Sequence, residues 1–316
     1  MSFKDSKVVI VGLGNVGATT AYSIINQGLC EEIVLIDINK EKAYGEALDM
    51  QQSVYFMNRN IKVKAGDYSD CKDADVVIIT ASAPMPKDSH DRLQMLAPSI
   101  KIIKSIVNST MASGFNGIFI IVSNPVDIMS YITWKESGLP KNQVIGSGTT
   151  LDSARLSCRL ADMYHLDAKS VSAYVCGEHG DSEMVTWSSA TIGGKSVEDV
   201  LKDNAERTKD ATKETLRHAV IEDGWQIFNR KGNTCYGIAA ATTAIVKSIL
   251  FNENRIYPVS VYLDGKYGMN DIFLSVPTII DKTGAKEIVE INMKEDEQKA
   301  LEESYKVLKD FCQQLD

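Results

Sequence analysis

Residues 8–17 read VVIVGLGNVG, and this stretch indicates the fold of the first half of the chain. The apolar run before Gly12 is typical of a buried parallel strand, and a segment of helical length follows Gly17. Gly12 permits a tight turn, Gly14 lets the backbone approach a pyrophosphate, and Gly17 allows the helix to pack closely against the strand. The strand, the glycines and the helix in this order predict a dinucleotide-binding turn.

An acidic residue completes the fingerprint. Asp37 ends the next apolar run, about 20 residues after the glycines, where a carboxylate accepts hydrogen bonds from an adenosine ribose. Its negative charge would repel a 2'-phosphate. The sequence therefore favours NAD over NADP as the cofactor.

The first half of the chain alternates short β-branched runs with longer helical segments. The expected strands cover residues 7–11, 33–36, 61–64, 76–80 and 118–122. Helices are expected at 18–27, with Gly28 as the C-cap, and at 41–53. This alternation predicts an α/β fold with a Rossmann-type, doubly wound parallel sheet.

The pattern changes after about residue 146. The expected elements are then helices at 152–164, 197–229 and 236–250, and strands at 171–175 and 259–263. We therefore expect an NAD-binding Rossmann domain at 1–147, followed by a mixed α+β substrate and catalytic domain at 148–316.

Composition excludes several classes of function. The formal net charge is -8, without a block of lysine or arginine, which argues against nucleic acid as a partner. No window approaches 18 uncharged apolar residues, so we expect no membrane partner and a cytoplasmic location. The six cysteines never form the C-x-x-C spacing of zinc sites, and we expect no metal.

One of the four histidines stands out. His90, His165 and His218 lie among charged residues or near a helix end, as surface histidines commonly do. His179 lies in GEHGD (177–181), directly after a predicted strand, and its small neighbours leave room for a ligand. His179 is therefore the candidate proton carrier.

These motifs occur together in one known family. The chain resembles the L-lactate and L-malate dehydrogenase family over nearly its whole length, and it is most similar to L-lactate and L-2-hydroxyisocaproate dehydrogenases. The shared motifs are 12–17, Asp37, Arg92, SNPVD (123–127), LDSAR (151–155), GEHGD (177–181) and Thr234.

The resemblance implies roles for the polar residues. Asp152 would fix the tautomer of His179, which gives a proton to the substrate carbonyl. Arg155 would grip the substrate carboxylate with its planar guanidinium, and Arg92 would polarise the carbonyl when a lid closes. The substrate-binding residues implied by the family are Arg155, Asn124, Thr234, Met85 and Arg92.

The resemblance also implies a set of contacts to NAD. These are Gly12, Gly14, Asn15, Val16, Gly17, Asp37, Lys42, Tyr68, Thr80, Ala81, Ser82, Val122, Asn124 and Ser147. The family usually has glycine where Ser82 stands, so the backbone there would approach the cofactor less closely.

The expected substrate is a small 2-oxo or 2-hydroxy acid, with pyruvate and L-lactate as the first choice. Malate dehydrogenases of the family carry an arginine on the lid, whereas the corresponding stretch here is APMPK (83–87). Met85 or Pro86 would leave a second carboxylate unpaired, so oxaloacetate should be a poor substrate. Longer aliphatic 2-oxo acids, as used by L-2-hydroxyisocaproate dehydrogenases, are the close alternative.

Two further expectations concern assembly and regulation. The family implies a homotetramer or homodimer and a role in glycolysis or fermentation. Ser157 and Ser172 stand where sugar-phosphate-activated relatives have an arginine and a histidine. We therefore expect no activation by fructose 1,6-bisphosphate.

Two rival classes share parts of the pattern. An NAD-dependent glycosidase would need a metal site and a sugar cleft. A non-catalytic NAD-binding protein would keep the glycines but need not keep His179, Asp152, Arg155 and Arg92 together. The joint presence of these four residues favours a dehydrogenase.

Overall fold

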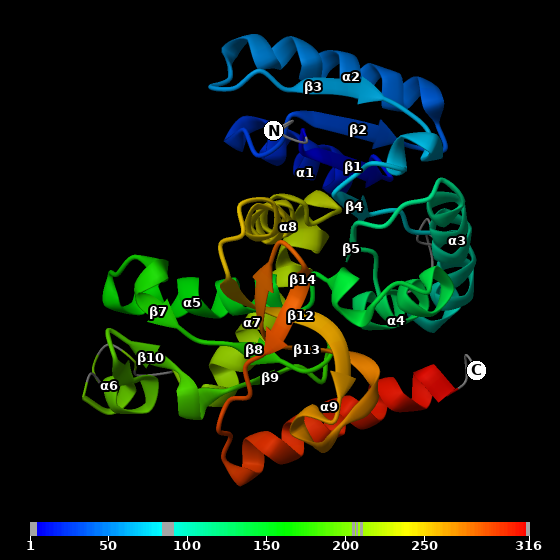
Figure 1. Ribbon diagram of the computed structural model, residues 1–316. Helices are drawn as coiled ribbons and strands as arrows, with labels where there is room; N and C mark the ends of the chain where they lie inside the picture. Colours follow the sequence, from blue (N-terminus) through cyan, green and yellow to red (C-terminus); the bar gives the residue numbers. More distant parts are fainter. Residues whose placement is uncertain (1–4, 84–91, 204–205, 207, 209–210, 314–316) are drawn as a thin grey trace.

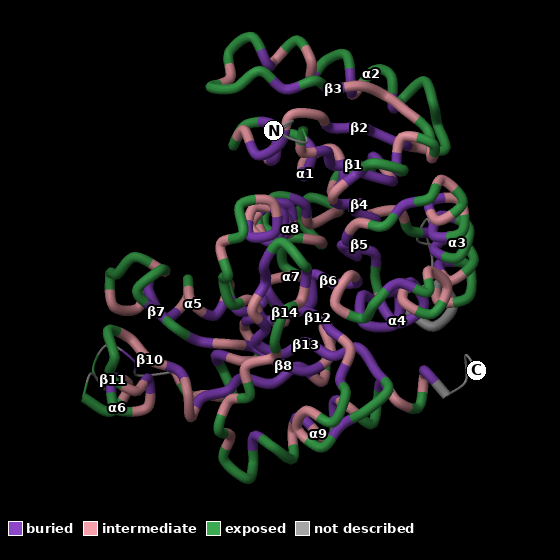
Figure 2. The backbone as a smooth tube through the Cα atoms, viewed as in Figure 1, coloured by how far each residue is buried: buried purple, intermediate pink, exposed green. Residues whose placement is uncertain are grey.

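A computed structural model describes residues 5–83, 92–203, 206, 208 and 211–313. The N-terminal strands and α2 lie at one end of the molecule, and the C-terminal helix α9 lies at the other (Figure 1). Buried backbone follows the central strands, and the outer helices are largely exposed on one side (Figure 2).

The first half forms a parallel sheet with the strand order β3-β2-β1-β4-β5-β6. This is the strand order of a doubly wound dinucleotide fold. Successive strands are added on one side of β1 as far as β3 and on its other side from β4 onward, while all six strands stay parallel. The Rossmann-type prediction is confirmed. The strands are β1 (Lys7–Val11), β2 (Glu32–Ile36), β3 (Lys62–Ala65), β4 (Val76–Ile79), β5 (Ile118–Ile121) and β6 (Val144–Gly146).

Register explains why the cofactor turn lies at one edge of this sheet. Val11 pairs with Ile36 of β2 and with Ile79 of β4, so the three strands end side by side. The residues that follow them, including Gly12 and Asp37, therefore meet at the carboxyl edge.

Helices cover the sheet and connect the two halves of the chain. α1 packs against α8 although they lie far apart in sequence, and α3 packs against α4. As predicted, Gly28 ends α1 in the left-handed conformation. The helices are α1 (Asn15–Gln27), α2 (Lys40–Ser53), α3 (Arg92–Ala112), α4 (Val126–Ser137), α5 (Thr150–Tyr164), α6 (Val197–Asp203), α7 (Lys213–Lys231), α8 (Tyr236–Leu250) and α9 (Glu295–Gln313).

Three strands of the second half continue the same sheet. β12 (Arg255–Asp264) joins β6 through the antiparallel pair Ser260 and Gly146, and β13 (Asn270–Asp281) and β14 (Gly284–Ile288) follow. A Cβ atom on Gly146 would lie 2.7 Å from the Cβ of Ser260, so glycine allows this close approach. The domain division at 147/148 falls between β6 and α5 and stays a prediction.

Two elements that were each predicted as one continuous segment are divided in the structure. The expected strand at 171–175 is divided between β7 (Val171–Ser172) and β8 (Val175–Cys176), because the two ends pair with different partners. Those partners are β10 (Thr191–Ile192), which also pairs with β11 (Lys195–Ser196), and β9 (Met184–Val185).

The expected helix at 197–229 is two helices, α6 and α7. The side chain of Thr212 accepts a hydrogen bond from the backbone N–H of Thr215, and the Thr215 side chain caps the Thr212 backbone in return. This capping box begins α7 anew.

Candidate active site

The turn after β1 shows why two of its glycines are needed for folding. Gly12 has φ +97°, and a Cβ there would lie 2.7 Å from the backbone nitrogen of Ala81. A Cβ on Gly17 would lie 1.9 Å from the Gly12 carbonyl oxygen. Gly14 differs, because its Cβ position faces open space, with no described atom within 4 Å. This space fits a pyrophosphate that approaches the backbone at the start of α1.

Polar side chains next to the turn hold it in place. Asp37 accepts hydrogen bonds from the backbone N–H groups of Leu13 (2.7 Å) and Asn39 (2.9 Å). The hydroxyl of Thr80 donates to the carbonyl of Gly12 at 2.6 Å. Thr80 therefore supports the turn, which is a structural contribution beyond its predicted cofactor contact.

The other predicted cofactor contacts come from several elements. Asn15 begins α1 and is exposed, as are Lys42 in the first turn of α2 and Ser82 after β4. Tyr68 begins the short 3-10 helix Tyr68–Cys71 and is half-buried, and burial raises its pKa. The carbonyl of Ala81 accepts a hydrogen bond from Ser123 at 2.6 Å.

The predicted catalytic pair is assembled. Asp152 lies in the first turn of α5 and is only 1% exposed. Its Oδ2 lies 2.7 Å from Nδ1 of His179, and its Oδ1 accepts a hydrogen bond from Nη1 of Arg155 at 2.6 Å. This arrangement places a proton on Nδ1 and leaves Nε2 of the ring for a substrate.

The loop that carries His179 is anchored by a buried carboxylate. Asp127 follows the cis Asn124–Pro125 peptide bond and accepts the backbone N–H of His179 at 3.0 Å. Its other oxygen accepts the hydroxyl of Ser260 at 2.5 Å. Burial raises the pKa of Asp127 to about 6. Asp127 lies in the SNPVD motif (123–127), but no role for it was predicted from the sequence.

A cavity of about 420 Å³ brings the predicted residues together. It is lined from the first half of the chain by Val16, Val122 and Asn124. The second half contributes four polar residues and an apolar wall, and Ser147, which lies between the two halves in the sequence, also lines the cavity. The polar residues are Asp152, Arg155, His179 and Thr234, and the wall is made of Leu151, Ile221, Trp225, Phe228 and Ile238. Met85 and the side chain of Arg92 lie outside the described residues.

The charges in this cavity favour a protonated histidine. Burial disfavours the imidazolium of His179, but the charge and hydrogen bond of Asp152 outweigh it and raise the pKa of His179 to about 9. Burial also works against ionised Asp152, yet the positive charges of His179 and Arg155 keep the pKa of Asp152 below its ordinary value. At neutral pH the ring therefore holds a proton to donate.

Sequence reasoning missed one acidic residue of this cavity. Glu183 lines it and is 3% exposed, and burial, with the charge of Asp152, raises the pKa of Glu183 to about 8. It stands four residues after His179, but no helix spans them, so spacing alone carried no signal. Both oxygens of Asp152 already take part in hydrogen bonds with His179 and Arg155, so Asp152 holds these two side chains through shared protons. The expected absence of a metal stays a prediction.

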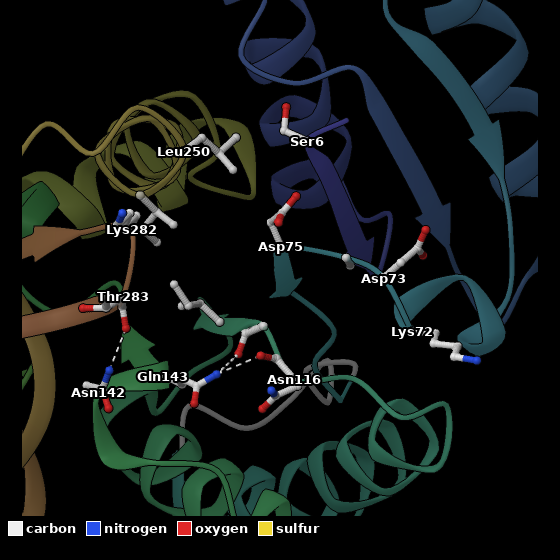
Figure 3. Close-up of a pocket in the computed structure, with 14 residues that line it drawn as sticks. Ser6, Lys72, Asp73, Asp75, Asn116, Asn142, Gln143, Leu250, Lys282 and Thr283 are labelled. Carbon is white, nitrogen blue, oxygen red and sulfur yellow. Dashed lines mark hydrogen bonds between the residues drawn. The ribbon is translucent and has the colours of Figure 1, made fainter. Parts of the chain in front are cut away.

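A larger cavity lies at the opposite edge of the sheet. Its volume is about 660 Å³, and Ser6, Asp75 and Gln143 line it just before β1, β4 and β6 (Figure 3). Gln143 donates to the carbonyl of Asn116, and Asn142 donates to the carbonyl of Thr283 (Figure 3). None of the predicted site residues that the structure describes lines this cavity.

Comparison with known protein families covers almost the whole chain. Residues 6–146 match the lactate/malate dehydrogenase NAD binding domain, and residues 149–315 match the lactate/malate dehydrogenase alpha/beta C-terminal domain. The chain is 48% identical over 309 residues to L-lactate dehydrogenase 3 from Bacillus cereus, covering 98% of each protein. It is also 48% identical over 305 residues to L-lactate dehydrogenase 2 of the same species, covering 96% of each.

Solved structures agree with this comparison. The minor L-lactate dehydrogenase from Enterococcus mundtii, in its ligands-bound form, superposes with a TM-score of 0.93 at 44% identity, covering 97% of each chain. A lactate dehydrogenase from a Medee basin deep-sea metagenome library gives the same TM-score at 43% identity, covering 98% of each chain.

Proposed function

The chain belongs to the lactate/malate dehydrogenase family, and from this premise we propose that it interconverts pyruvate and L-lactate with NAD. The observation that carries the proposal is the shared cavity in which His179, Asp152 and Arg155 lie beside residues that follow the cofactor-binding strands. The enzyme is an NAD-dependent oxidoreductase of 2-hydroxy acids.

Each side chain has a defined task in the proposed reaction. NADH, when bound, supplies the hydride that reduces the carbonyl carbon. His179 donates the proton from Nε2 to the carbonyl oxygen and becomes neutral, while Asp152 keeps the remaining proton on Nδ1. Arg155 uses one guanidinium nitrogen for Asp152 and has others for the substrate carboxylate. Arg92 is proposed to polarise the carbonyl.

The cofactor fits the residues present. The open space over Gly14 leaves room for the pyrophosphate, and Asp37 lies at the end of β2, where a ribose would be bound. We propose Asn15, Val16 and Lys42 as further contacts on the adenosine and phosphate side. Val122, Asn124 and Ser147 are proposed for the nicotinamide side.

Substrate choice follows from the cations of the cavity. Among its described lining residues Arg155 is the single lysine or arginine, so a monocarboxylate is matched and a second carboxylate is not. An unpaired buried carboxylate costs several kcal/mol. We therefore propose that oxaloacetate is a poor substrate.

A longer aliphatic 2-oxo acid is a second candidate substrate. Ile221, Trp225 and Phe228 form an apolar wall, and Gly224 between them adds no side chain. This wall favours binding of a longer apolar tail.

The test is NADH oxidation with pyruvate, 2-oxobutyrate, 4-methyl-2-oxopentanoate and oxaloacetate at one pH. We expect kcat/KM for pyruvate to exceed that for oxaloacetate by at least about 100-fold. An oxaloacetate value equal to or above the pyruvate value would contradict the proposal. Activity on a 2-oxo acid that persists in the presence of a metal chelator would exclude the glycosidase class.

Assembly and location are proposed on separate grounds. α2 and the following 3-10 helix Val54–Phe56 expose Tyr44, Leu48, Tyr55 and Phe56, the last two by more than 80%. An exposed apolar group of this size marks an interaction surface, so we propose a homodimer or homotetramer. All six cysteines are free thiols, which suits a reducing cytoplasm. No helix of the described ranges is long and apolar enough to cross a membrane.

A further inference from the structure

Glu183 is a buried acidic residue, and no hydrogen bond of its Oε1 to the described residues accounts for its burial. Its backbone is held on both sides: its N–H donates to Gly180 at 3.3 Å, and its carbonyl accepts Nη1 of Arg217 at 3.2 Å. The side chain reaches the substrate cavity, and its buried Oε1 has no hydrogen-bond partner among the described residues. A buried polar atom without a partner is costly and calls for a functional explanation.

The carboxyl of Glu183 lies against the catalytic pair. One of its oxygens, one oxygen of Asp152 and a ring nitrogen of His179 all lie within 4.8 Å of one another. The positive charges that face it are protonated His179, Arg155 on α5 and Arg217 on α7. Arg217 donates its hydrogen bonds to the backbone carbonyl of Glu183 and to the carboxylate of Glu214, and not to the carboxyl of Glu183.

The charge of this cluster depends on two protons. With Glu183 neutral and His179 protonated, the four residues Glu183, His179, Arg155 and Asp152 carry a net charge of +1 before the proposed Arg92 is added, and this positive charge favours an anionic 2-oxo acid. Ionised Glu183 would cancel this charge. Burial and the charge of Asp152 raise the pKa of Glu183 to about 8, so the acid is neutral below that pH.

We propose that Glu183 is a positioning residue that holds a second proton of the substrate cavity, and that the 2-oxo acid binds tightly only when both Glu183 and His179 are protonated. This inference rests on the proposed function, because the bound anion is the proposed substrate. In this role Glu183 does not react with the substrate; while neutral, it leaves the positive charges of His179 and Arg155 available to bind the substrate anion.

Two consequences follow for pH dependence. The basic limb of kcat/KM for the 2-oxo acid reports two ionisations, near pH 8 and near pH 9. Removal of the Glu183 charge also lowers the pKa of His179, because that charge favours the imidazolium. Oxidation of the 2-hydroxy acid, which needs neutral His179, then extends to lower pH.

The test compares Glu183→Gln with the wild type at saturating NADH from about pH 6 to 10. We expect log kcat/KM for pyruvate to fall with a slope approaching about -2 in the wild type and about -1 in the variant. The control is Glu222→Gln, which removes a carboxylate that is 49% exposed on α7 and should keep the wild-type profile. Equal slopes in the wild type and Glu183→Gln would overturn the inference.

A second measurement uses the wild type alone and stands even if the variant fails to fold. Oxamate, an unreactive isostere of pyruvate, is bound to the enzyme–NADH complex in weak buffer, and proton uptake is followed with an indicator. We expect uptake to exceed one proton per site near about pH 9. A maximum of one proton or less at every pH would refute the role of Glu183. A wild type that reduces no 2-oxo acid would refute the proposed function instead.

Discussion

Replacement of Asp152 with Asn should lower the pH range in which the enzyme reduces pyruvate by about 2.5 units or more. The neighbours of His179 raise its pKa from an ordinary 6.5 to about 9, which corresponds to about 3 kcal/mol in favour of the imidazolium. Asp152 supplies the largest favourable part, through its charge and its 2.7 Å contact with Nδ1. Without this charge the burial of the ring remains, so we expect the pKa of His179 to fall to 6.5 or below.

The size of the effect follows from the fraction of protonated His179. At pH 8 this fraction is about nine-tenths in the wild type, and it should fall to about one-thirtieth in Asp152→Asn. We expect kcat/KM for pyruvate at pH 8 to fall at least about 30-fold. Below the pKa of His179 in the variant, the ring is protonated in both proteins. Most of the loss of kcat/KM should therefore disappear at about pH 5.5.

The assay is steady-state kcat/KM for pyruvate from about pH 5.5 to 9.5, with NADH binding measured separately. The matched control is Asp223→Asn. It removes a carboxylate of α7 that accepts hydrogen bonds of 2.9 and 2.5 Å from Arg159 of α5, the helix that also carries Asp152. The control should keep the wild-type profile. A basic limb in Asp152→Asn within half a pH unit of the wild type would refute the reasoning.

Four other changes test separate parts of the structure. His179→Gln should lower kcat by about 10²- to 10⁴-fold with the Kd for NADH nearly unchanged, and a variant that keeps a tenth of the wild-type rate would exclude the proton-donor role. Gly17→Ala should lower the free energy of unfolding by at least about 2 kcal/mol, because its Cβ meets the Gly12 carbonyl, and calorimetry measures this loss. Gly14→Ala should unfold like the wild type but bind NADH less tightly, which a binding titration measures. Gly224→Ala places a methyl group about 3.6 Å from Nη2 of Arg155, so kcat/KM should fall more for 4-methyl-2-oxopentanoate than for pyruvate, and equal losses would argue against this wall as the tail site. Fructose 1,6-bisphosphate should leave the KM for pyruvate within about twofold, and a tenfold fall would contradict that prediction.

The parallel sheet was predictable because its signals are local. Residues 8–11 are an unbroken apolar run that forms a buried strand, and the next residues form a turn in which Gly12 has a positive φ that favours glycine. Errors arose where partners decide the structure. The segment 171–175 has the composition of a strand, but its two ends pair with β10 and with β9.

The candidate site divides in the same way. His179, Asp152 and Arg155 were identified by motif, and the structure assembles them in one cavity. Glu183 carried no motif of its own, because its importance lies in missing hydrogen-bond partners and in its distance from His179.

The dinucleotide turn and the β-α-β alternation of the first half could be predicted from the residues alone, because both depend on backbone conformation and side-chain chemistry within about 20 residues. The roles of His179 and Asp152, which lie 27 residues apart, were predicted only through the resemblance to a known family. That Asp127 anchors the His179 loop together with Ser260, and that the unpaired acid Glu183 lies against His179 and Asp152, could be known only from the folded arrangement. Such facts depend on which distant side chains share a buried volume, because burial and nearby charge, rather than residue type, decide where a proton is held.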